Sequence, residues 1–323
     1  MPSSLPLPLA TGHAPGHQGG LETKRFVIVT GKGGVGKTTV CAAEALALAT
    51  KGKRVLVCMC NAKERLSSMF GSELIGPQVK QVASNVWAVN MDPELALAEY
   101  GMIALHSKTL FKLLFDNKYV RTFFRAVPGM QEWTLLGKAW WHTTERREDA
   151  SWLYDVVILD APATGHGLDM LRVPKIILDL VPPGILRRDA ELAWKMFQDP
   201  KLSAVVLVTL PEEMPTTETI ELAKALREEL KLPIGKIVVN GVLPPLFSKE
   251  ERAALEAAGP ARGDSPGEAA LAAARSRAVR ERVQASSLHR LAEELPISPS
   301  FLPQLFEDAA QPAAIRELAK RMA

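Results

Sequence analysis

Cysteine is scarce in this sequence, and its few positions suit neither disulfides nor a metal. The 323 residues include three cysteines, Cys41, Cys58 and Cys60, an odd number that cannot complete a disulfide framework. Cys58 and Cys60 are one residue apart rather than two, and no second pair or nearby histidine completes a zinc site. We therefore expect three reduced thiols that pack in the interior, and no zinc site.

The sequence also lacks long apolar runs and a strong charge of one sign. No run approaches the roughly 18 apolar residues that a membrane-spanning helix needs. Residues 1–22 have neither a basic start nor an unbroken apolar core, which excludes a secretory signal, and their prolines and glycines favour a disordered arm. The formal net charge of +3 is small for this length and argues neither for nor against a nucleic-acid or anionic-membrane partner. We expect no nucleic-acid partner. The expected location is cytoplasmic.

Apolar runs rich in β-branched residues alternate with helical patterns along the chain. This alternation is typical of an α/β fold with a mostly parallel, doubly wound sheet. The runs are continuously apolar, so we expect the strands to be covered on both faces. A helix is expected over residues 38–50, and strands over residues 26–30, 55–60, 86–91, 155–160, 204–210 and 237–240.

Two stretches interrupt this alternation. Residues 92–150 contain no convincing strand and gather aromatic side chains, with breaks near 116–117 and 128–129. We expect them to form a helical subdomain inserted into one domain that spans residues 23–323. Residues 258–267 (AGPARGDSPG) indicate a Gly/Pro-rich surface loop between two helices.

A glycine-rich loop directly follows the first expected strand. Gly31-xxxx-Gly36-Lys37-Thr38 matches the Walker A pattern of P-loop proteins and opens a helix, as that pattern requires. Glycines let successive backbone N–H groups point at phosphate, and the helix N-terminus adds partial positive charge. In this pattern the lysine meets the β- and γ-phosphates and the Thr38 hydroxyl binds Mg²⁺ directly. We expect ATP and magnesium here, with nucleotide contacts from Gly33, Gly34, Val35, Gly36, Lys37, Thr38 and Thr39.

A second lysine, Lys32, lies just inside this loop. The sequence Gly-Lys-Gly-Gly-Val-Gly-Lys-Thr-Thr resembles the deviant Walker A motif of the class that contains MinD, ParA, ArsA and the nitrogenase iron protein. The resemblance implies that Lys32 reaches across a dimer interface to the phosphates bound by the partner subunit. A cation supplied in this way makes dimer closure depend on bound nucleotide, as an arginine finger does. The alternative is a solvated surface lysine.

The segment after the strand expected to end at Asp160 narrows the resemblance. Residues 160–167 (DAPATGHG) are similar to the switch II segment of the ArsA/GET ATPases, with the proline one residue early. The resemblance implies that Asp160 is the Walker B carboxylate, which holds Mg²⁺ through water, and that Thr164, Gly165 and His166 belong to switch II. The alternative is that Asp160 ends its strand and caps the following turn.

The last of the expected strands ends in Asn240. This position is similar to a family strand whose terminal asparagine contacts adenine, and an amide can both donate and accept along a purine edge. The alternative is an asparagine that suits a turn at the end of a strand. The resemblance runs from about residue 24 to about residue 245, and this family inserts its helical subdomain where residues 92–150 lie.

The sequence departs from the family in switch I. ArsA/GET ATPases have roughly Asp-Pro-Ala-His-x-Leu-Ser-Asp-x-Phe after the second strand, whereas residues 61–70 here are NAKERLSSMF. The family aspartate, which polarises the attacking water, therefore falls on Asn61, whose amide accepts no proton. Positioned acid–base help is worth roughly 10²–10⁴ in rate, so we expect weak or partner-dependent hydrolysis. Glu64 could substitute from one helical turn later, and a capping role is the alternative.

Three interpretations of function follow from these residues. The first is an ArsA/GET-like ATPase that works as a nucleotide-dependent dimer, with Lys32, Lys37, Asn61 and Asp160 at its catalytic centre. The second is a non-hydrolysing regulatory or scaffold subunit in a heterodimer with an Asp-bearing paralogue. The third is a positioning ATPase of the ParA/MinD type.

The inserted stretch suggests a client for the first interpretation. In the GET branch of the family, paired helical subdomains form a groove for the transmembrane helix of a tail-anchored protein. The ArsA branch binds metalloids through cysteines, which residues 92–150 lack. Apolar side chains of this stretch could line such a groove or form its own core: Met102, Ile103, Leu105, Leu110, Phe111, Leu114 and Phe115. The final segment, residues 313–323, has a helical apolar stripe that we expect to pack against the domain.

Overall fold

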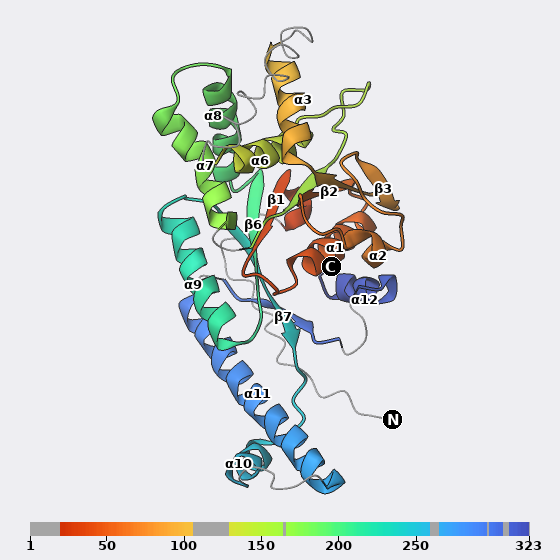
Figure 1. Ribbon diagram of the computed structural model, residues 1–323, viewed down its shortest axis with the longest axis vertical. Coiled ribbons are helices and arrows are strands. Elements are labelled where there is room, and N and C mark those ends of the chain that lie inside the picture. The colour runs from red at the N-terminus through yellow and green to blue at the C-terminus, as the bar shows by residue number, and fades with distance from the viewer. Residues whose placement is uncertain are drawn as a thin grey trace.

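A central twisted sheet with helices on both faces forms the body of the protein. The computed structural model describes residues 20–105, 129–163, 166–258, 265–295, 297–305 and 310–322. Figure 1 shows an elongated molecule in which α3 and α8 lie at one end and α10 and α11 at the other. Of the described helices, none is long and apolar enough to cross a membrane.

Eight strands form this sheet, in the order β3-β4-β2-β5-β1-β6-β7-β8. Every pairing is parallel except the antiparallel one between β3 and β4. The expected α/β fold with a mostly parallel sheet is therefore confirmed. The strands are β1 (Phe26–Thr30), β2 (Val55–Cys60), β3 (Lys80–Ala83), β4 (Val86–Met91), β5 (Val156–Asp160), β6 (Ser203–Thr209), β7 (Ile234–Val242) and β8 (Ser300–Pro303).

Helices cover both faces of the sheet, and a short 3-10 helix, η1 (Leu21–Thr23), precedes β1. The face built by α1, α2 and α12 is separate from the face built by α6, α7, α8 and α9. The described α-helices are α1 (Lys37–Thr50), α2 (Leu66–Phe70), α3 (Pro93–Leu105), α6 (Met130–His142), α7 (His166–Leu180), α8 (Ile185–Gln198), α9 (Glu213–Glu228), α10 (Lys249–Ala257), α11 (Pro266–Glu294) and α12 (Pro312–Met322).

The strands divide their side chains between two cores, one on each face. In β1, Phe26 and Ile28 belong to the core under α6 to α9, whereas Val27 and Val29 belong to the core under α1, α2 and α12. Successive strand residues point to opposite faces, so a strand covered on both sides must be apolar throughout. All five residues of β1 are buried, as the continuous apolar runs predicted.

Six strands were predicted and all six are present, with bounds that differ by a few residues. The largest difference is in β7, which begins three residues before the predicted start at residue 237. The edge strands β3 and β8 were not predicted. Each has four residues, β3 includes Lys80 and Gln81, and β8 ends in a proline, so neither has the long apolar pattern of a central strand.

The last residues of the expected disordered arm are ordered in the structure. Leu21 and Glu22 form most of the 3-10 turn η1, in which Leu21 is buried in the core beneath α1. The Glu22 carboxylate also lies 3.6 Å from the Lys51 ammonium at the end of α1. An apolar contact and an ion pair thus order this short segment, and residues 1–19 lie outside the described part of the chain.

The described part of the inserted stretch consists of two helices followed by an irregular segment over residues 143–150. Helix α3 leads into it and α6 leads out, packed against one another. Gly129 precedes α6 with a φ of 82°, so the predicted break at 128–129 coincides with a helix start. The break near 116–117 lies outside the described residues. After α6 the chain returns to β5 through an irregular segment with a single bridge between Arg146 and Trp152.

The C-terminal helix packs onto the sheet domain, as its apolar stripe predicted. Ile315, Leu318 and Met322 are buried against the core that α1 covers. The predicted loop at 258–267 is shorter than expected, because α11 already begins at Pro266 with Ser265 as its cap. Proline is favoured at the first position of a helix, where its missing N–H leaves no hydrogen bond unmade.

Candidate nucleotide-binding site

Residues 31–36 form a tight loop between β1 and α1. Gly31 and Gly36 have φ values of 151° and 89°, which residues other than glycine rarely adopt. A Cβ at Gly31 would lie 2.1 Å from the Val208 carbonyl oxygen of β6. A Cβ at Gly36 would lie 2.3 Å from Nδ2 of Asn240 on β7. The glycines therefore let the loop lie against the ends of two neighbouring strands.

Lys37 points back into this loop. Its ammonium donates to the carbonyl oxygens of Gly31 and Lys32, each at 3.1 Å. Burial lowers the pKa of Lys37, and the charge of Asp160 opposes that effect. The backbone at Gly33 and Gly34 is exposed, so the loop has an open side beside a cation. Such a cradle suits a phosphate chain.

Thr38 and Asp160 bring two oxygen ligands together beside the loop. The Thr38 hydroxyl donates to Oδ2 of Asp160 at 2.6 Å, although 122 residues separate them. Asp160 is only 7% exposed, and burial raises the pKa of its carboxyl, while the Thr38 hydrogen bond and the Lys37 charge oppose the rise. Hydroxyl and carboxylate oxygens are hard ligands of the kind that Mg²⁺ prefers. These residues fit a magnesium ion.

Cys41 also contacts Asp160. Its fully buried thiol lies on α1 beside this carboxylate and helps to lower the pKa of Asp160. Burial raises the pKa of Cys41 well above its usual range, so the thiol stays protonated. Sequence reasoning treated Cys41 only as a packing residue. The signal in the sequence was that Cys41 comes three residues after Thr38, which places both side chains on one face of the helix.

Lys32 forms an ion pair with a glutamate of its own chain. Its ammonium lies 2.6 Å from Oε1 of Glu218 on α9, and the two side chains are 25% and 34% exposed. Lys32 is therefore held against α9 rather than fully solvated. Glu218 was not predicted, because a glutamate on an amphipathic helix has no distinguishing pattern in the sequence. The role of Lys32 across a dimer interface stays a prediction.

The switch I position begins directly after β2. Asn61 is exposed and has a φ of 46°, a left-handed conformation that asparagine tolerates better than most residues. Its backbone N–H donates to the Met91 carbonyl at 3.0 Å. Asn90 on β4 holds the next residue, Ala62, by accepting from its N–H and donating to its carbonyl. Sequence reasoning missed this asparagine, which braces the start of switch I.

Glu64 caps the short helix α2. Its carboxylate accepts from the Ser67 backbone N–H at 2.8 Å and from the Ser67 hydroxyl at 2.5 Å. This capping role for Glu64 was the predicted alternative to a catalytic role. The carboxylate is thereby engaged with the helix N-terminus, where a negative charge is favourable.

Asn240 lies at the loop, near the end of β7. Its Nδ2 donates to the Val35 carbonyl at 3.0 Å, so the amide ties β7 to the loop. A contact with adenine stays a prediction. Of the expected switch II residues, Thr164 and Gly165 lie outside the described residues, and His166 begins α7.

Comparison with known proteins identifies the family. The sequence model of the anion-transporting ATPases, the ArsA family, matches residues 24–182 and 187–257. The chain belongs to the ArsA/GET family of ATPases. The resemblance inferred from the short motifs is confirmed, and the matched region includes both the glycine-rich loop and Asp160. Membership identifies the chain as an ATP-binding P-loop ATPase.

Several proteins similar to this chain are ATPases by name. The chain is 29% identical to the ATPase BagA of Mycobacterium tuberculosis over 247 residues, which are 75% of this chain and 72% of that protein. It is 26% identical to the ATPase GET3 of Kluyveromyces lactis over 256 residues, 68% of this chain and 73% of that protein. It is 28% identical to the arsenical pump-driving ATPase of Escherichia coli over 241 residues, 68% of this chain and 40% of that protein.

The contact between Gly36 and Asn240 predicts different effects for two similar substitutions. Gly36→Ala and Gly34→Ala both place a side chain at a φ near 90°, but only the first meets a neighbour. We expect Gly34→Ala to lower the free energy of unfolding by about 1 kcal/mol through backbone strain. Gly36→Ala should cost about 0.5–1.5 kcal/mol more, because Asn240 must move and lose its bond to Val35.

Urea unfolding measures both free energies, with Asn240→Ala as the control background. In that background the extra cost of Gly36→Ala should vanish, because the obstructing amide is gone. Equal destabilisation by Gly34→Ala and Gly36→Ala in the wild-type background would contradict this packing.

Proposed function

We propose that this protein is an ArsA/GET-type ATPase that binds MgATP at residues 31–39, works as a nucleotide-dependent dimer and hydrolyses ATP weakly on its own. The observation that carries the proposal is the 2.6 Å contact between Thr38 and Asp160 beside the Lys37 ammonium. It supplies a hydroxyl, a carboxylate and a cation at one edge of a glycine-rich loop.

The residues at the loop have distinct parts in this proposal. Exposed backbone N–H groups and Lys37 bind the phosphates, and Thr38 and Asp160 hold magnesium. Magnesium, when bound, supplies charge that stabilises the phosphoryl oxygens. Cys41 packs beside the Asp160 carboxylate and helps to orient it. Asn240 positions the loop and contacts adenine through its amide.

Weak hydrolysis follows from the amide at Asn61. An amide can orient water but cannot accept its proton, so one source of acid–base help is missing. Glu64 supplies no substitute while its carboxylate caps α2 through Ser67. Positioning and electrostatics from Lys32, Lys37 and magnesium leave a slow reaction. The alternative is a non-hydrolysing subunit that lends Lys32 to an Asp-bearing paralogue.

Restoring the carboxylate should restore turnover. We expect Asn61→Asp to raise the kcat for ATP hydrolysis by roughly 10²–10⁴, because the family carboxylate then faces the attacking water. Phosphate release by the purified chain measures this rate. Asn85→Asp is the matched control, since Asn85 also has a left-handed φ, 59°, in the turn between β3 and β4. Fast turnover by the wild-type chain alone, or an equal gain in both variants, would contradict the proposal.

A dimer in which Lys32 meets the partner's phosphates requires that the Lys32–Glu218 pair opens. Two such pairs open for each dimer formed. A partly exposed ion pair is worth about 0.2–1 kcal/mol, so their loss costs about 0.4–2 kcal/mol in dimer formation. The pair thus opposes closure only modestly and sets a threshold that bound nucleotide must exceed.

Removing the Lys32–Glu218 ion pair should favour the dimer. We expect Glu218→Gln to tighten ATP-dependent dimerisation about 2- to 30-fold, which follows from the energy of two surface ion pairs. Sedimentation equilibrium with and without MgATP measures the dissociation constant. Glu221→Gln, an exposed position on the same helix, is the control and should have no effect. Weaker dimerisation of Glu218→Gln would show that Glu218 belongs to the dimer interface instead.

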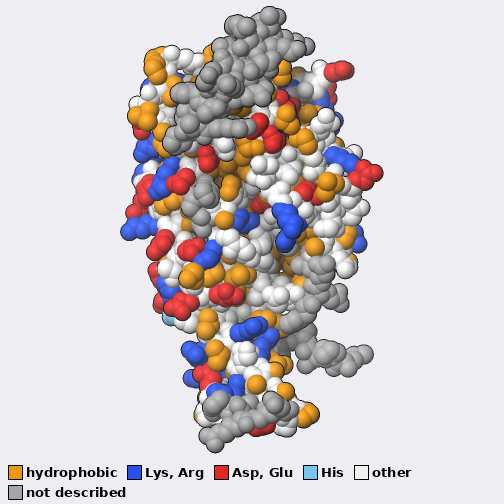
Figure 2. Space-filling model, viewed as in Figure 1, with side chains coloured by type: hydrophobic (Ala, Val, Ile, Leu, Met, Phe, Trp, Pro, Cys, Tyr) orange, Lys and Arg blue, Asp and Glu red, His pale blue; other side chains and the backbone are white. Residues whose placement is uncertain are grey.

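Apolar side chains at the α3 end of the molecule support an apolar-helix client. Figure 2 shows hydrophobic side chains on this end, around the α3, α7 and α8 region. Met102 of the predicted apolar series is 40% exposed, and the other six members lie outside the described side chains. Further exposed apolar residues of these helices are Leu95, Ile176, Leu180, Ile185 and Leu192. The ParA/MinD alternative requires ATP-dependent co-sedimentation with DNA or liposomes instead.

A further inference from the structure

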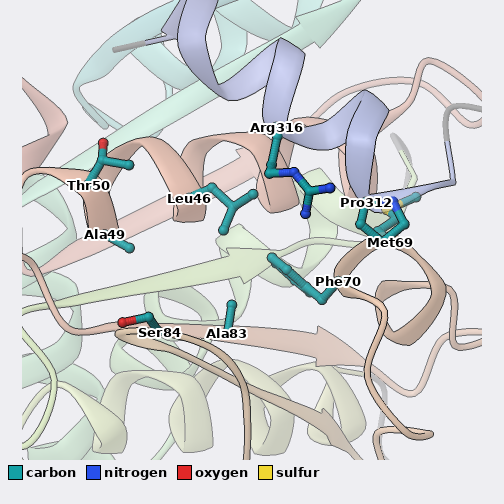
Figure 3. A pocket seen from close by; sticks show the side chains of 9 residues that line it. All are labelled: Leu46, Ala49, Thr50, Met69, Phe70, Ala83, Ser84, Pro312 and Arg316. Atoms are coloured by element: carbon teal, nitrogen blue, oxygen red, sulfur yellow. The ribbon is translucent and has the colours of Figure 1, made fainter.

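A pocket lies on the face of the sheet that α1, α2 and α12 cover. It has a volume of about 380 Å³ and is bounded by the end of α1, by α2, by the turn between β3 and β4, and by the start of α12. Figure 3 shows how these four elements surround it. The P-loop is at the opposite end of α1, at least nine residues or about 13 Å away along the helix. The pocket is therefore separate from the nucleotide site.

The walls of this pocket are mostly apolar, and one cation faces into it. Leu46, Met69, Phe70 and Pro312 provide large apolar surfaces. The guanidinium of Arg316 extends from α12 toward the space between Leu46 and Phe70 (Figure 3). Among the described residues, no carboxylate or carbonyl pairs with Arg316. The volume is within the 300–1,000 Å³ that is usual for small-molecule sites.

We propose that this pocket binds a small amphipathic carboxylate with an unbranched or aromatic apolar body. The apolar walls bury the body, and the planar guanidinium of Arg316 pairs with the carboxylate through two parallel hydrogen bonds. A neutral apolar ligand gains only contact with the walls, because the exposed Arg316 stays solvated, whereas a carboxylate adds an ion pair with the guanidinium. Charge complementarity thus selects one anionic group on an apolar chain.

The ligand also regulates the nucleotide site, and this part of the inference rests on the proposed function. Met69 and Phe70 belong to α2, the helix that Glu64 caps. This helix comes shortly after the predicted switch I residue Asn61 in the sequence. Leu46 belongs to α1, which begins at Lys37 of the P-loop. A ligand wedged between α1 and α2 holds the switch I helix against the P-loop helix. Binding of ligand and of nucleotide is therefore coupled, and the coupling is reciprocal.

Decanoate is a suitable probe for the test, titrated into the full chain by calorimetry below its micelle concentration. We expect saturable binding with one site per chain. Arg316→Gln should weaken it about tenfold, and decanol should bind the wild-type chain about tenfold more weakly than decanoate. Lys320→Gln, an exposed lysine on the same helix, should leave the affinity unchanged. Arg316 is exposed, so its substitution should leave the fold intact, which circular dichroism checks.

The outcomes separate the pocket from the nucleotide site. Decanoate should bind Lys37→Ala as it binds the wild type, and saturating decanoate should change the ATP affinity of the wild type several-fold. Absence of saturable binding, equal affinity for decanol, or equal loss in Arg316→Gln and Lys320→Gln would overturn the site. Decanoate binding with an unchanged ATP affinity would overturn its regulatory role and leave the proposed ATPase standing.

Discussion

A hydrogen bond of 2.6 Å between Thr38 and Asp160 joins the first helix to the end of β5, and the arrangement of the site depends on it. The contact exists because β5 pairs in parallel with β1, so that the carboxyl ends of both strands lie at one edge of the sheet. Ligands of open parallel sheets bind at this edge, where loops leave the strands. Burial raises the pKa of the Asp160 carboxyl, and the hydrogen bond from Thr38 and the charge of Lys37 oppose that rise and so favour the carboxylate.

The same edge explains how the predicted switch segments are held near the loop. Asn61 leaves β2, which pairs with β5 on the other side, and α7 begins six residues after Asp160. Asn90 fixes the start of switch I through Ala62, and Glu64 fixes the start of α2 through Ser67. In the proposed MgATP complex, a change at the loop would therefore reach both α2 and α7 through short segments. Such segments are typical of proteins that respond to bound nucleotide.

The features that could be predicted from the sequence are local ones. The central strands have continuous β-branched runs, the P-loop is a contiguous motif, and the Glu64 carboxylate lies three residues before Ser67, whose N–H donates to it. The features that were missed depend on long-range pairing. Glu218 is 186 residues from Lys32, and no pattern in α9 marks it as a partner. The edge strands β3 and β8 have only four residues each, and their pairing depends on neighbours already in place.

Binding of MgATP tests the central claim most directly, because the loop, Lys37, Thr38 and Asp160 all meet at one ligand. Calorimetric titration should give one saturable site per chain, tighter with magnesium than without it. Asp160→Asn should remove the magnesium dependence, and Lys37→Ala should abolish binding. A titration without saturable heat, or an equal affinity in the wild type and Lys37→Ala, would contradict the account.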